Sequence, residues 1–261
     1  MLVKVSKRIV KKAMNALGYD IEVRKRFASQ STFHAQMPDV SKGDAEIMER
    51  VRPFTMTSGE RIYALVQAVR YVMANRVPGS IVECGVWRGG SMMAVAHTLL
   101  GLGRDDIDLY MFDTFEGMPM PTARDVNIWG DNAIAKFMQT RVSSDGSDWC
   151  RASLEDVTHN MASTGYPANR MHFVPGKVET TLPESAPAEL ALLRLDTDWY
   201  ESTLHEMEHL FPRLSTGGVI IIDDYGHWAG ARQAIDEYLA AKKVTLLLNR
   251  IDDTGRMAIK C

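Results

Sequence analysis

Three aspartates in the last third of the chain stand directly after apolar segments. Asp196 follows the segment 190–195, and Asp223 and Asp224 follow the segment 217–222. Each segment has the character of a buried parallel strand, and the helix and strand between Asp196 and Asp223 predict one right-handed crossover. The strand ends would then lie side by side, at the edge of an α/β sheet where ligands bind. Because converging carboxylates repel one another, we expect Mg²⁺ or a similar hard cation there.

An Asp-Asp pair after a strand has a second common use, which is to cap the following helix. The pair alone therefore does not establish a metal site. Asp196 at the end of another strand, and a ligand-binding pattern in the first half of the chain, favour the metal.

Length and composition predict one α/β domain with an N-terminal extension. The chain has 261 residues, 46% of them apolar, and a net charge of −3, which argues against a nucleic-acid-binding protein. Three cysteines without metal-type spacing indicate reduced thiols, so we expect a cytoplasmic protein. We find neither the apolar core of a signal peptide nor a membrane-spanning run.

The first residues are locally basic. Residues 1–26 carry eight Lys and Arg side chains, and apolar residues between 3 and 17 form a weak helical stripe. We favour an accessory helix that packs on its own domain or on a second subunit, and contact with an anionic membrane surface is the alternative. Residues 27–50 have no clear period and are predicted as loop and short helix. We therefore assign 1–50 to the extension and 51–261 to the main domain.

From residue 59 onward, helical and strand patterns alternate, which predicts a doubly wound, mostly parallel sheet of seven strands. The last two strands are expected as a hairpin-like pair, with an antiparallel strand at the edge of the sheet. The predicted strands are 80–84, 108–112, 171–174, 190–195, 217–222, 244–248 and 257–260. The predicted helices are 59–75, 89–100, 131–142, 149–164, 200–213 and 228–241.

A glycine-containing turn follows the first strand. Gly85 and the pair 89–90 let the backbone approach a ligand, and the start of the next helix offers free N–H groups. The dinucleotide fingerprint is absent, because Trp87 and Arg88 occupy the turn where a pyrophosphate needs small residues. Arg88 and Ser91 are instead candidates for holding a carboxylate.

Asp113, at the end of the second strand, is suited to the two hydroxyls of a ribose. Glu83, at the end of the first strand, is suited to an ammonium group, and capping of the Gly85 turn is its structural alternative. A ribonucleoside with a small charged tail fits these residues better than a diphosphate does. S-adenosylmethionine has that chemistry and is the predicted cofactor.

Five blocks of the chain resemble the macrocin O-methyltransferase family, which methylates sugar hydroxyls of antibiotics. The blocks occur in the family's order between about residues 50 and 260. They are Phe54–Ser58, Glu83–Gly90, Asp113–Pro119, Arg194–Thr203 and Asp223–Gly226.

The resemblance implies a class I methyltransferase fold and an O-methyltransferase that depends on S-adenosylmethionine and a metal, commonly as a dimer or larger oligomer. The metal ligands that it implies are Asp196, Asp223 and Asp224. The cofactor contacts that it implies are Thr57, Ser58, Glu83, Gly85, Trp87, Arg88, Ser91, Asp113 and Phe115. Trp199 stands at a position where a smaller apolar residue is frequent in the family. Because this position is a candidate for contact with the acceptor, the resemblance does not identify the acceptor.

The implied mechanism uses Mg²⁺ to acidify a sugar hydroxyl, with Asp196 as the base and in-line methyl transfer from the sulfonium. His227 is an alternative base. Tyr200, Tyr225 and Trp228 are candidates for the acceptor pocket, since aromatic rings stack on sugars. We expect a sugar of a glycosylated natural product or of a bacterial surface glycan as the acceptor.

Two other functions remain open from the sequence. A catechol-type O-methyltransferase would use the same metal and cofactor on a phenol that carries neighbouring hydroxyls. A non-catalytic methyltransferase-like module would bind a partner through the basic N-terminal segment. The three acids argue against the module, because a degenerate domain has no need for converging carboxylates.

Overall fold

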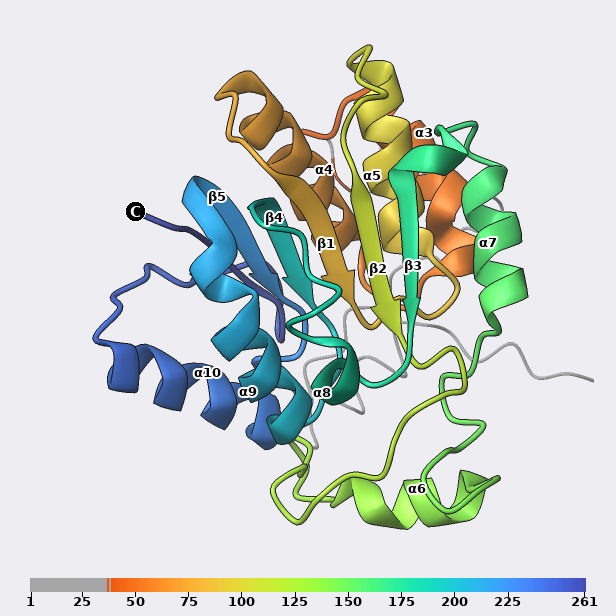
Figure 1. Cartoon of the computed structure of the whole chain (residues 1–261), viewed down its shortest axis with the longest axis vertical. Coiled ribbons are helices and arrows are strands. Elements are labelled where there is room, and N and C mark those ends of the chain that lie inside the picture. The colour runs from red at the N-terminus through yellow and green to blue at the C-terminus, as the bar shows by residue number, and fades with distance from the viewer. Residues whose placement is uncertain (1–36, 38) are drawn as a thin grey trace, which may run out of the picture.

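The computed structural model describes residue 37 and residues 39–261, and these form a seven-stranded sheet with helices on both faces (Figure 1). The strand order is β3-β2-β1-β4-β5-β7-β6, and the first five of these strands are parallel. β7 runs antiparallel to β5 and pairs with β6 at the sheet edge. The predicted doubly wound, mostly parallel sheet is confirmed. The predicted basic helix within residues 1–26, with its membrane or subunit contact, lies outside the described residues.

The strands and helices have the following bounds. The strands are β1 (Ser80–Cys84), β2 (Leu109–Asp113), β3 (Met171–Pro175), β4 (Leu190–Leu195), β5 (Leu214–Ile222), β6 (Asn249–Arg250) and β7 (Arg256–Ile259). The helices of the described part are α3 (Lys42–Val51), α4 (Gly59–Ala74), α5 (Gly90–Gly101), α6 (Ala133–Thr140), α7 (Leu154–Ala162), α8 (Val178–Thr181), α9 (Tyr200–His209) and α10 (Ala229–Lys242).

Side chains along the buried strands point alternately to the two faces of the sheet, and this divides the core into two layers. On β1, Ile81 belongs to the cluster packed with α3, α4, α5 and α7, while Val82 belongs to the cluster packed with α8, α9 and α10. Successive side chains of a strand point to opposite faces, so strands covered on both sides consist almost wholly of apolar residues. α3 begins within the predicted extension, and its Met48 and Val51 are buried in the first layer.

Several predicted boundaries needed correction. Residues 244–248 do not form a strand, and the terminal pair is β6 with β7. Val244, Leu246 and Leu248 pack instead against the core layer formed with α8, α9 and α10. The apolar residues of this segment therefore alternate as in a strand, although the segment pairs with no strand. The helix predicted over 200–213 ends at His209 and continues as a 3₁₀ turn that contains Pro212. α6 and α7 are shorter than predicted at both ends, and they begin only after the capping residues Asn132 and Ser153.

The strand register brings the ends of β1, β4 and β5 together. Cys84 pairs with Leu195, and Leu195 pairs with Ile222. The residues that follow these strands therefore emerge at one sheet edge, beside the point where the strand order changes direction. Gly85 has φ +82°, and a Cβ there would lie 2.0 Å from the backbone oxygen of Asp196. Only glycine allows the turn after β1 and the segment after β4 to approach this closely.

No helix of the described residues has the length and apolar character needed to cross a membrane.

Candidate active site

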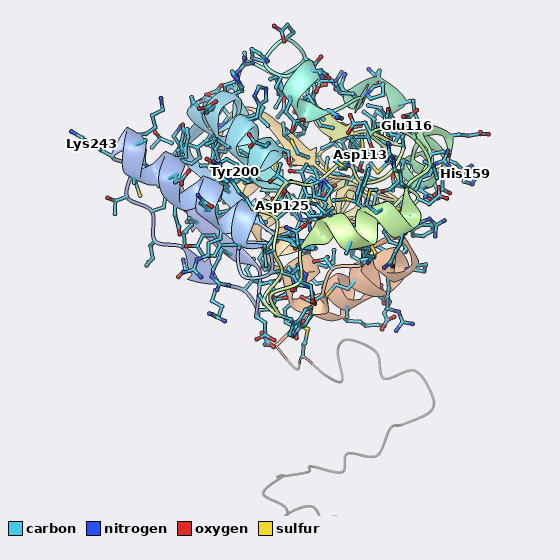
Figure 2. The ribbon with its side chains drawn as sticks, turned by 90° about the horizontal axis from the view of Figure 1, so that it is seen from below. Asp113, Glu116, Asp125, His159, Tyr200 and Lys243 are labelled. Atoms are coloured by element: carbon cyan, nitrogen blue, oxygen red, sulfur yellow. The ribbon has the colours of Figure 1, made fainter. Side chains whose placement is uncertain are left out.

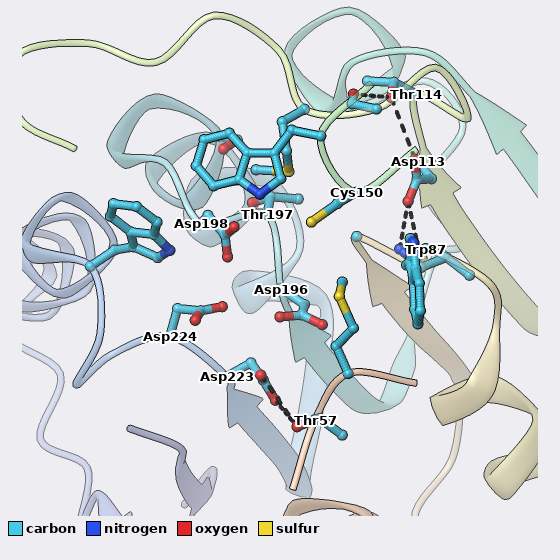
Figure 3. Close-up of a pocket in the computed structure, with 18 of the residues that line it drawn as sticks. Thr57, Trp87, Asp113, Thr114, Cys150, Asp196, Thr197, Asp198, Asp223 and Asp224 are labelled. Carbon is cyan, nitrogen blue, oxygen red and sulfur yellow. Dashed lines mark hydrogen bonds between the residues drawn. The ribbon is translucent and has the colours of Figure 1, made fainter. Parts of the chain in front are cut away.

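A cavity of about 510 Å³ opens at the carboxyl ends of β1, β2, β4 and β5. The turn after β1 and the end of β2 line one side, with Gly85, Trp87 and Asp113. The acidic segments after β4 and β5 line the middle, as Figure 3 shows. Segments around residues 54–57, 117–119, 127–129 and 149–150 complete the wall. A volume of this order suits a small-molecule ligand.

Asp196, Asp198 and Asp224 form a cluster in which each offers a carboxylate oxygen within 4.8 Å of the others. Burial, with repulsion from the neighbouring acids, raises the pKa of Asp196 and Asp224 well above the ordinary carboxyl value. The same causes raise the pKa of Asp198 to about 7. This arrangement is costly without a cation. Asp198 was not among the ligands predicted from the sequence, although its position two residues after Asp196 was a usable signal.

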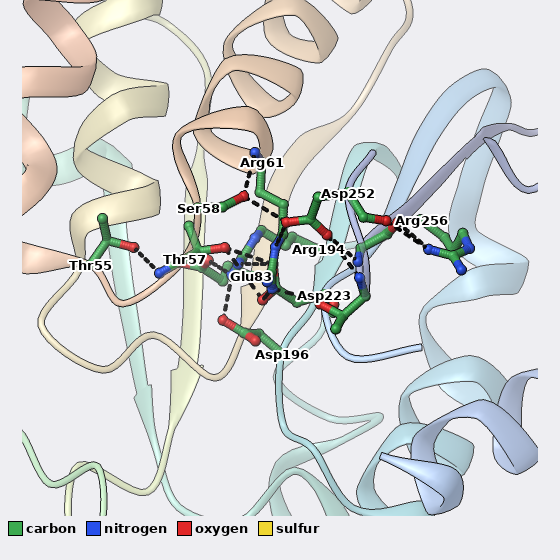
Figure 4. A network of polar contacts seen from close by, with 12 residues as sticks. Thr55, Thr57, Ser58, Arg61, Glu83, Arg194, Asp196, Asp223, Asp252 and Arg256 are labelled. Carbon is green, nitrogen blue, oxygen red and sulfur yellow. Dashed lines mark hydrogen bonds and ion pairs between the residues drawn. The ribbon is translucent and has the colours of Figure 1, made fainter. Parts of the chain in front are cut away.

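Asp223, a predicted ligand, lies beside this cluster but is held by two arginines. One carboxylate oxygen contacts Arg194 and the other contacts Arg61, and the hydroxyl of Thr57 lies 3.3 and 3.4 Å from the two oxygens (Figure 4). The side chain of Asp223 is 6% exposed. Its charge is therefore already compensated, unlike the charges of Asp198 and Asp224, for which the described residues provide no ion pair.

Arg194 lies at the centre of this network, and sequence reasoning assigned it no role. It pairs in register with Glu83 across β1 and β4, and its guanidinium contacts Glu83 at 2.5 Å and Asp196 at 2.7 Å. It is almost wholly buried. The available signal was an arginine inside an otherwise apolar strand, since a buried arginine requires acidic partners.

Glu83, predicted to bind an ammonium group, is buried and gives one oxygen to Arg194. Its Oε2 has no hydrogen-bond partner among the described residues. Burial outweighs the effect of Arg194 and raises the pKa of Glu83 to about 7. The structure thus leaves one acceptor of this carboxyl group available behind the Gly85 turn, and the ammonium contact stays a prediction.

Asp113 holds the turn that forms the other wall of the cavity. Its Oδ2 accepts from the N–H groups of Val86 (2.7 Å) and Trp87 (3.0 Å), and its Oδ1 accepts from Phe115 N–H at 2.8 Å. Trp87 and Phe115 have positive φ, so these bonds stabilise a conformation that their side chains disfavour. Asp113 lines the cavity, and its predicted contact with ribose is untested.

The remaining predicted cofactor residues divide into two groups. Thr57, Gly85, Trp87 and Ser91 line the cavity. Ser58, Glu83, Arg88 and Phe115 do not belong to the described lining. Ser58 caps α4 and donates to Asp252 at 2.6 Å, while Arg88 forms an ion pair with Asp156 at 2.9 Å. Phe115 is packed in the core.

Aromatic side chains gather beyond the acids. Trp149, Trp199 and Trp228 pack edge to face or tilted, with ring centroids 5.0–6.1 Å apart. Trp149 and Trp228 line the cavity, whereas Trp199 is buried and donates to the Pro119 carbonyl at 3.1 Å.

Three further candidates from the sequence lie near this aromatic group. His227 lines the cavity, and burial together with the charge of Arg61 lowers its pKa. The hydroxyls of Tyr200 and Tyr225 bond to Glu237 and Asp236 on α10, outside the described lining. Of the predicted acceptor residues, Trp228 thus lies at the cavity itself.

The segment between β2 and α6 is fixed over the acids by Asp125. This fully buried carboxylate accepts from Thr122 N–H at 2.6 Å and from Tyr200 N–H at 2.9 Å. Figure 2 shows Asp125 beside Tyr200, at the start of α9. A side chain from a distant segment therefore caps the helix that follows Asp198.

Comparison with known proteins gives the family. The sequence profile described as macrocin-O-methyltransferase (TylF) matches residues 7–259. Over 201 residues the chain is 36% identical to the 8-demethyl-8-(2,3-dimethoxy-α-L-rhamnosyl)-tetracenomycin-C 4'-O-methyltransferase of Streptomyces olivaceus. This match covers 77% of this chain and 73% of that protein. It is 33% identical to the demethyldecarbamoylnovobiocin O-methyltransferase of Streptomyces niveus, with the same coverage.

A solved structure agrees with these sequence matches. That of the O-methyltransferase NovP superposes with a TM-score of 0.69 at 32% identity, over 79% of this chain and 82% of that one. The fold, the acidic cavity and the match along nearly the whole chain lead to one assignment. The chain belongs to the macrocin-O-methyltransferase (TylF) family and is an O-methyltransferase.

Proposed function

We propose that this enzyme methylates a hydroxyl of a sugar, in a glycosylated natural product or a bacterial surface glycan, using S-adenosylmethionine and a hard divalent cation. The observation that carries the proposal is the cluster of Asp196, Asp198 and Asp224, placed between the Gly85 turn and the tryptophans. The relative from Streptomyces olivaceus, whose name contains a rhamnosyl group, supports a sugar acceptor.

The residues at the Gly85 turn fit the methyl donor. Gly85 lines the cavity, and Glu83, buried behind this turn, has an acceptor oxygen with no partner among the described residues. Trp87 adds an aromatic face to the same wall. When bound, S-adenosylmethionine supplies a methyl group whose bond to sulfur breaks as the new carbon–oxygen bond forms, leaving a neutral thioether.

The acid cluster fits a magnesium-type ion. All of its ligand atoms are carboxylate oxygens, which Mg²⁺ prefers. A bound cation would also relieve the repulsion between the three carboxylates. We assign Asp196, Asp198 and Asp224 to this ion, with Asp223 kept as the structural partner of the two arginines. Such an ion lowers the pKa of an alcohol and fixes its position.

The acceptor's proton must pass to a group of this chain. Asp196 is the base predicted from the sequence, but one of its oxygens is paired with Arg194. Asp198 has no ion pair among the described residues and lies toward Cys150, on the cavity side. We therefore propose Asp198 as the proton acceptor, with Asp196 orienting the acceptor oxygen.

The tryptophans and the Asp125-anchored segment would then exclude water and hold the sugar ring against the acids. Trp149 and Trp228 offer apolar faces to the cavity, and such faces stack on the C–H surface of sugars. Alignment of the hydroxyl with the methyl group would supply a large share of the rate enhancement for a transfer of this kind.

The decisive experiment is calorimetric titration of S-adenosylmethionine into the full chain, with Mg²⁺ and then with EDTA, followed by an assay with labelled methyl donor. We expect binding in both conditions and Mg²⁺-dependent methylation of a glycoside. Methylation of a catechol in preference to glycosides would favour the phenolic enzyme. If the cofactor bound in neither condition, the proposal would fall.

A further inference from the structure

Helix α9 carries a second group of metal-type ligands, chemically distinct from the acid cluster. His205, Glu208 and His209 are spaced i, i+3 and i+4, which places them on one face of the helix. The opposite part of α9, with Thr203, Glu206 and Met207, is buried against the sheet, so the three ligands lie on the outer side.

The three side chains are already close enough to share an ion. One potential ligand atom from each lies within 4.8 Å of the others. The imidazole rings of His205 and His209 are 4.3 Å apart between centroids. Both histidines are half-buried and Glu208 is exposed, so an ion could reach the three side chains from solvent.

A backbone carbonyl sets the orientation of one ligand. His205 Nε2 lies 3.3 Å from the oxygen of Leu182, just after α8. A carbonyl oxygen only accepts, so this contact assigns the ring proton to Nε2 and leaves the lone pair on Nδ1. Histidines that bind metals usually donate their other N–H to a carbonyl or carboxylate in this way.

We propose that His205, Glu208 and His209 bind a zinc-type transition-metal dication. Two imidazoles and one carboxylate suit Zn²⁺, Co²⁺, Ni²⁺ or Cu²⁺ and are a poor set for Mg²⁺, whose preferred ligands are oxygens. Three protein ligands leave water at the fourth position of a tetrahedral Zn²⁺. This inference stands apart from the proposed function, because it uses none of the residues at the cavity.

A bound ion would cross-link residues one turn apart on α9 and strengthen the contact between α9 and the end of α8. Binding to the folded state alone stabilises that state. EDTA would strip this site as well as the acid cluster, so loss of activity in EDTA would not identify the ion responsible.

The test titrates Zn²⁺ into metal-free full-length protein by calorimetry, with excess Mg²⁺ present to occupy the acid cluster. We expect one equivalent to bind. His209→Ala should weaken the affinity by at least the ~10–100-fold that loss of a supporting residue costs in other sites. His159→Ala is the matched control, because His159 is an exposed histidine on α7, far from α9 in Figure 2.

Spectroscopy with Cu²⁺ identifies the ligand atoms. We expect electron paramagnetic resonance to show nitrogen coupling in the wild type, and His205→Ala to reduce it to that of one nitrogen. Circular dichroism of each variant verifies that it is folded. Absence of Zn²⁺ binding, binding unchanged by His209→Ala, or a Cu²⁺ spectrum with oxygen ligands only would each overturn the proposal.

Discussion

The hydroxyl of Thr197 donates a 2.9 Å hydrogen bond to Oε1 of Glu206, a carboxyl group buried on α9. Thr197 stands between Asp196 and Asp198, so this bond supports the segment that carries both acids. The same segment is held by the Asp196 N–H, which donates to the Cys84 carbonyl at 2.9 Å. Asp198 has φ +70°, a conformation that needs such support.

Glu206→Ala should therefore lower activity through misplacement of the acids. Burial raises the pKa of Glu206 well above its ordinary value, and its Oε2 has no partner among the described residues. Glu206→Gln keeps the acceptor for Thr197 and should retain activity. We expect kcat to fall about 100-fold in Glu206→Ala, as small displacements can cost this much. Equal kcat in the two variants would exclude a positioning role.

The acid cluster should lower the thermal stability of the metal-free protein. Asp198→Asn removes one of three crowded carboxyl groups whose mutual repulsion raises their pKa, so we expect a higher Tm than the wild type in EDTA. Mg²⁺ should raise the Tm of the wild type and have little effect on that of the variant. Thermal unfolding with and without Mg²⁺ measures both, and Asp105→Asn, at an exposed acid on the loop before β2, is the control. A lower Tm of Asp198→Asn in EDTA would contradict the repulsion.

Asp223→Asn should behave in the opposite way. It leaves Arg61 and Arg194 without their common partner, and breaking a buried pair costs about 3–5 kcal/mol. We expect a loss of this order in urea unfolding, with the Mg²⁺-induced rise in Tm retained. Loss of the Mg²⁺ effect in Asp223→Asn, with stability unchanged, would restore Asp223 to the ligand set predicted from the sequence.

Arg194 should be needed for folding, because it is the buried cation shared by three acids. Arg194→Met leaves Glu83 and Asp223 as buried acids without this cation, and we expect destabilisation of about 3–5 kcal/mol. Adding Glu83→Gln should recover part of the loss, since one buried charge is removed. Urea unfolding of the single and double variants measures the coupling, and purely additive effects would argue against the pair.

Asp252 should contribute stability that depends on pH. Burial raises its pKa, but hydrogen bonds from Ser58, Arg61 and two backbone N–H groups outweigh this, so its pKa lies below the ordinary value. A depressed pKa stabilises the fold above the unfolded-state value of about 3.9 and loses that effect as pH falls below it. Asp252→Asn should therefore lower the Tm at pH 7, with the difference from the wild type shrinking below pH 4. A difference independent of pH would refute this.

The fold could be predicted from the sequence wherever the pattern is local. The apolar runs of β4 and β5, and the acids that follow them, place Asp196 and Asp224 at one edge. What escaped prediction depends on which residues face one another across strands. The pairing of Arg194 with Glu83 follows from strand register, whereas the contact of Asp223 with Arg61 depends on how α4 packs, and the place of Asp198 depends on the conformation of the segment after β4. Segment 244–248 was wrongly predicted as a strand, because its alternating apolar residues pack against helices and not in the sheet.

The close approach of Gly85 to the backbone of Asp196 has a consequence for how such enzymes change substrate. Main-chain contact sets how closely the Gly85 turn lies against the segment that carries Asp196 and Asp198. Trp149 and the segment around Asp125 come from other parts of the chain. Under the proposed function, substitutions in these peripheral segments would change which acceptor binds, while the contact between Gly85 and Asp196 would keep the donor site and the acids at the same spacing.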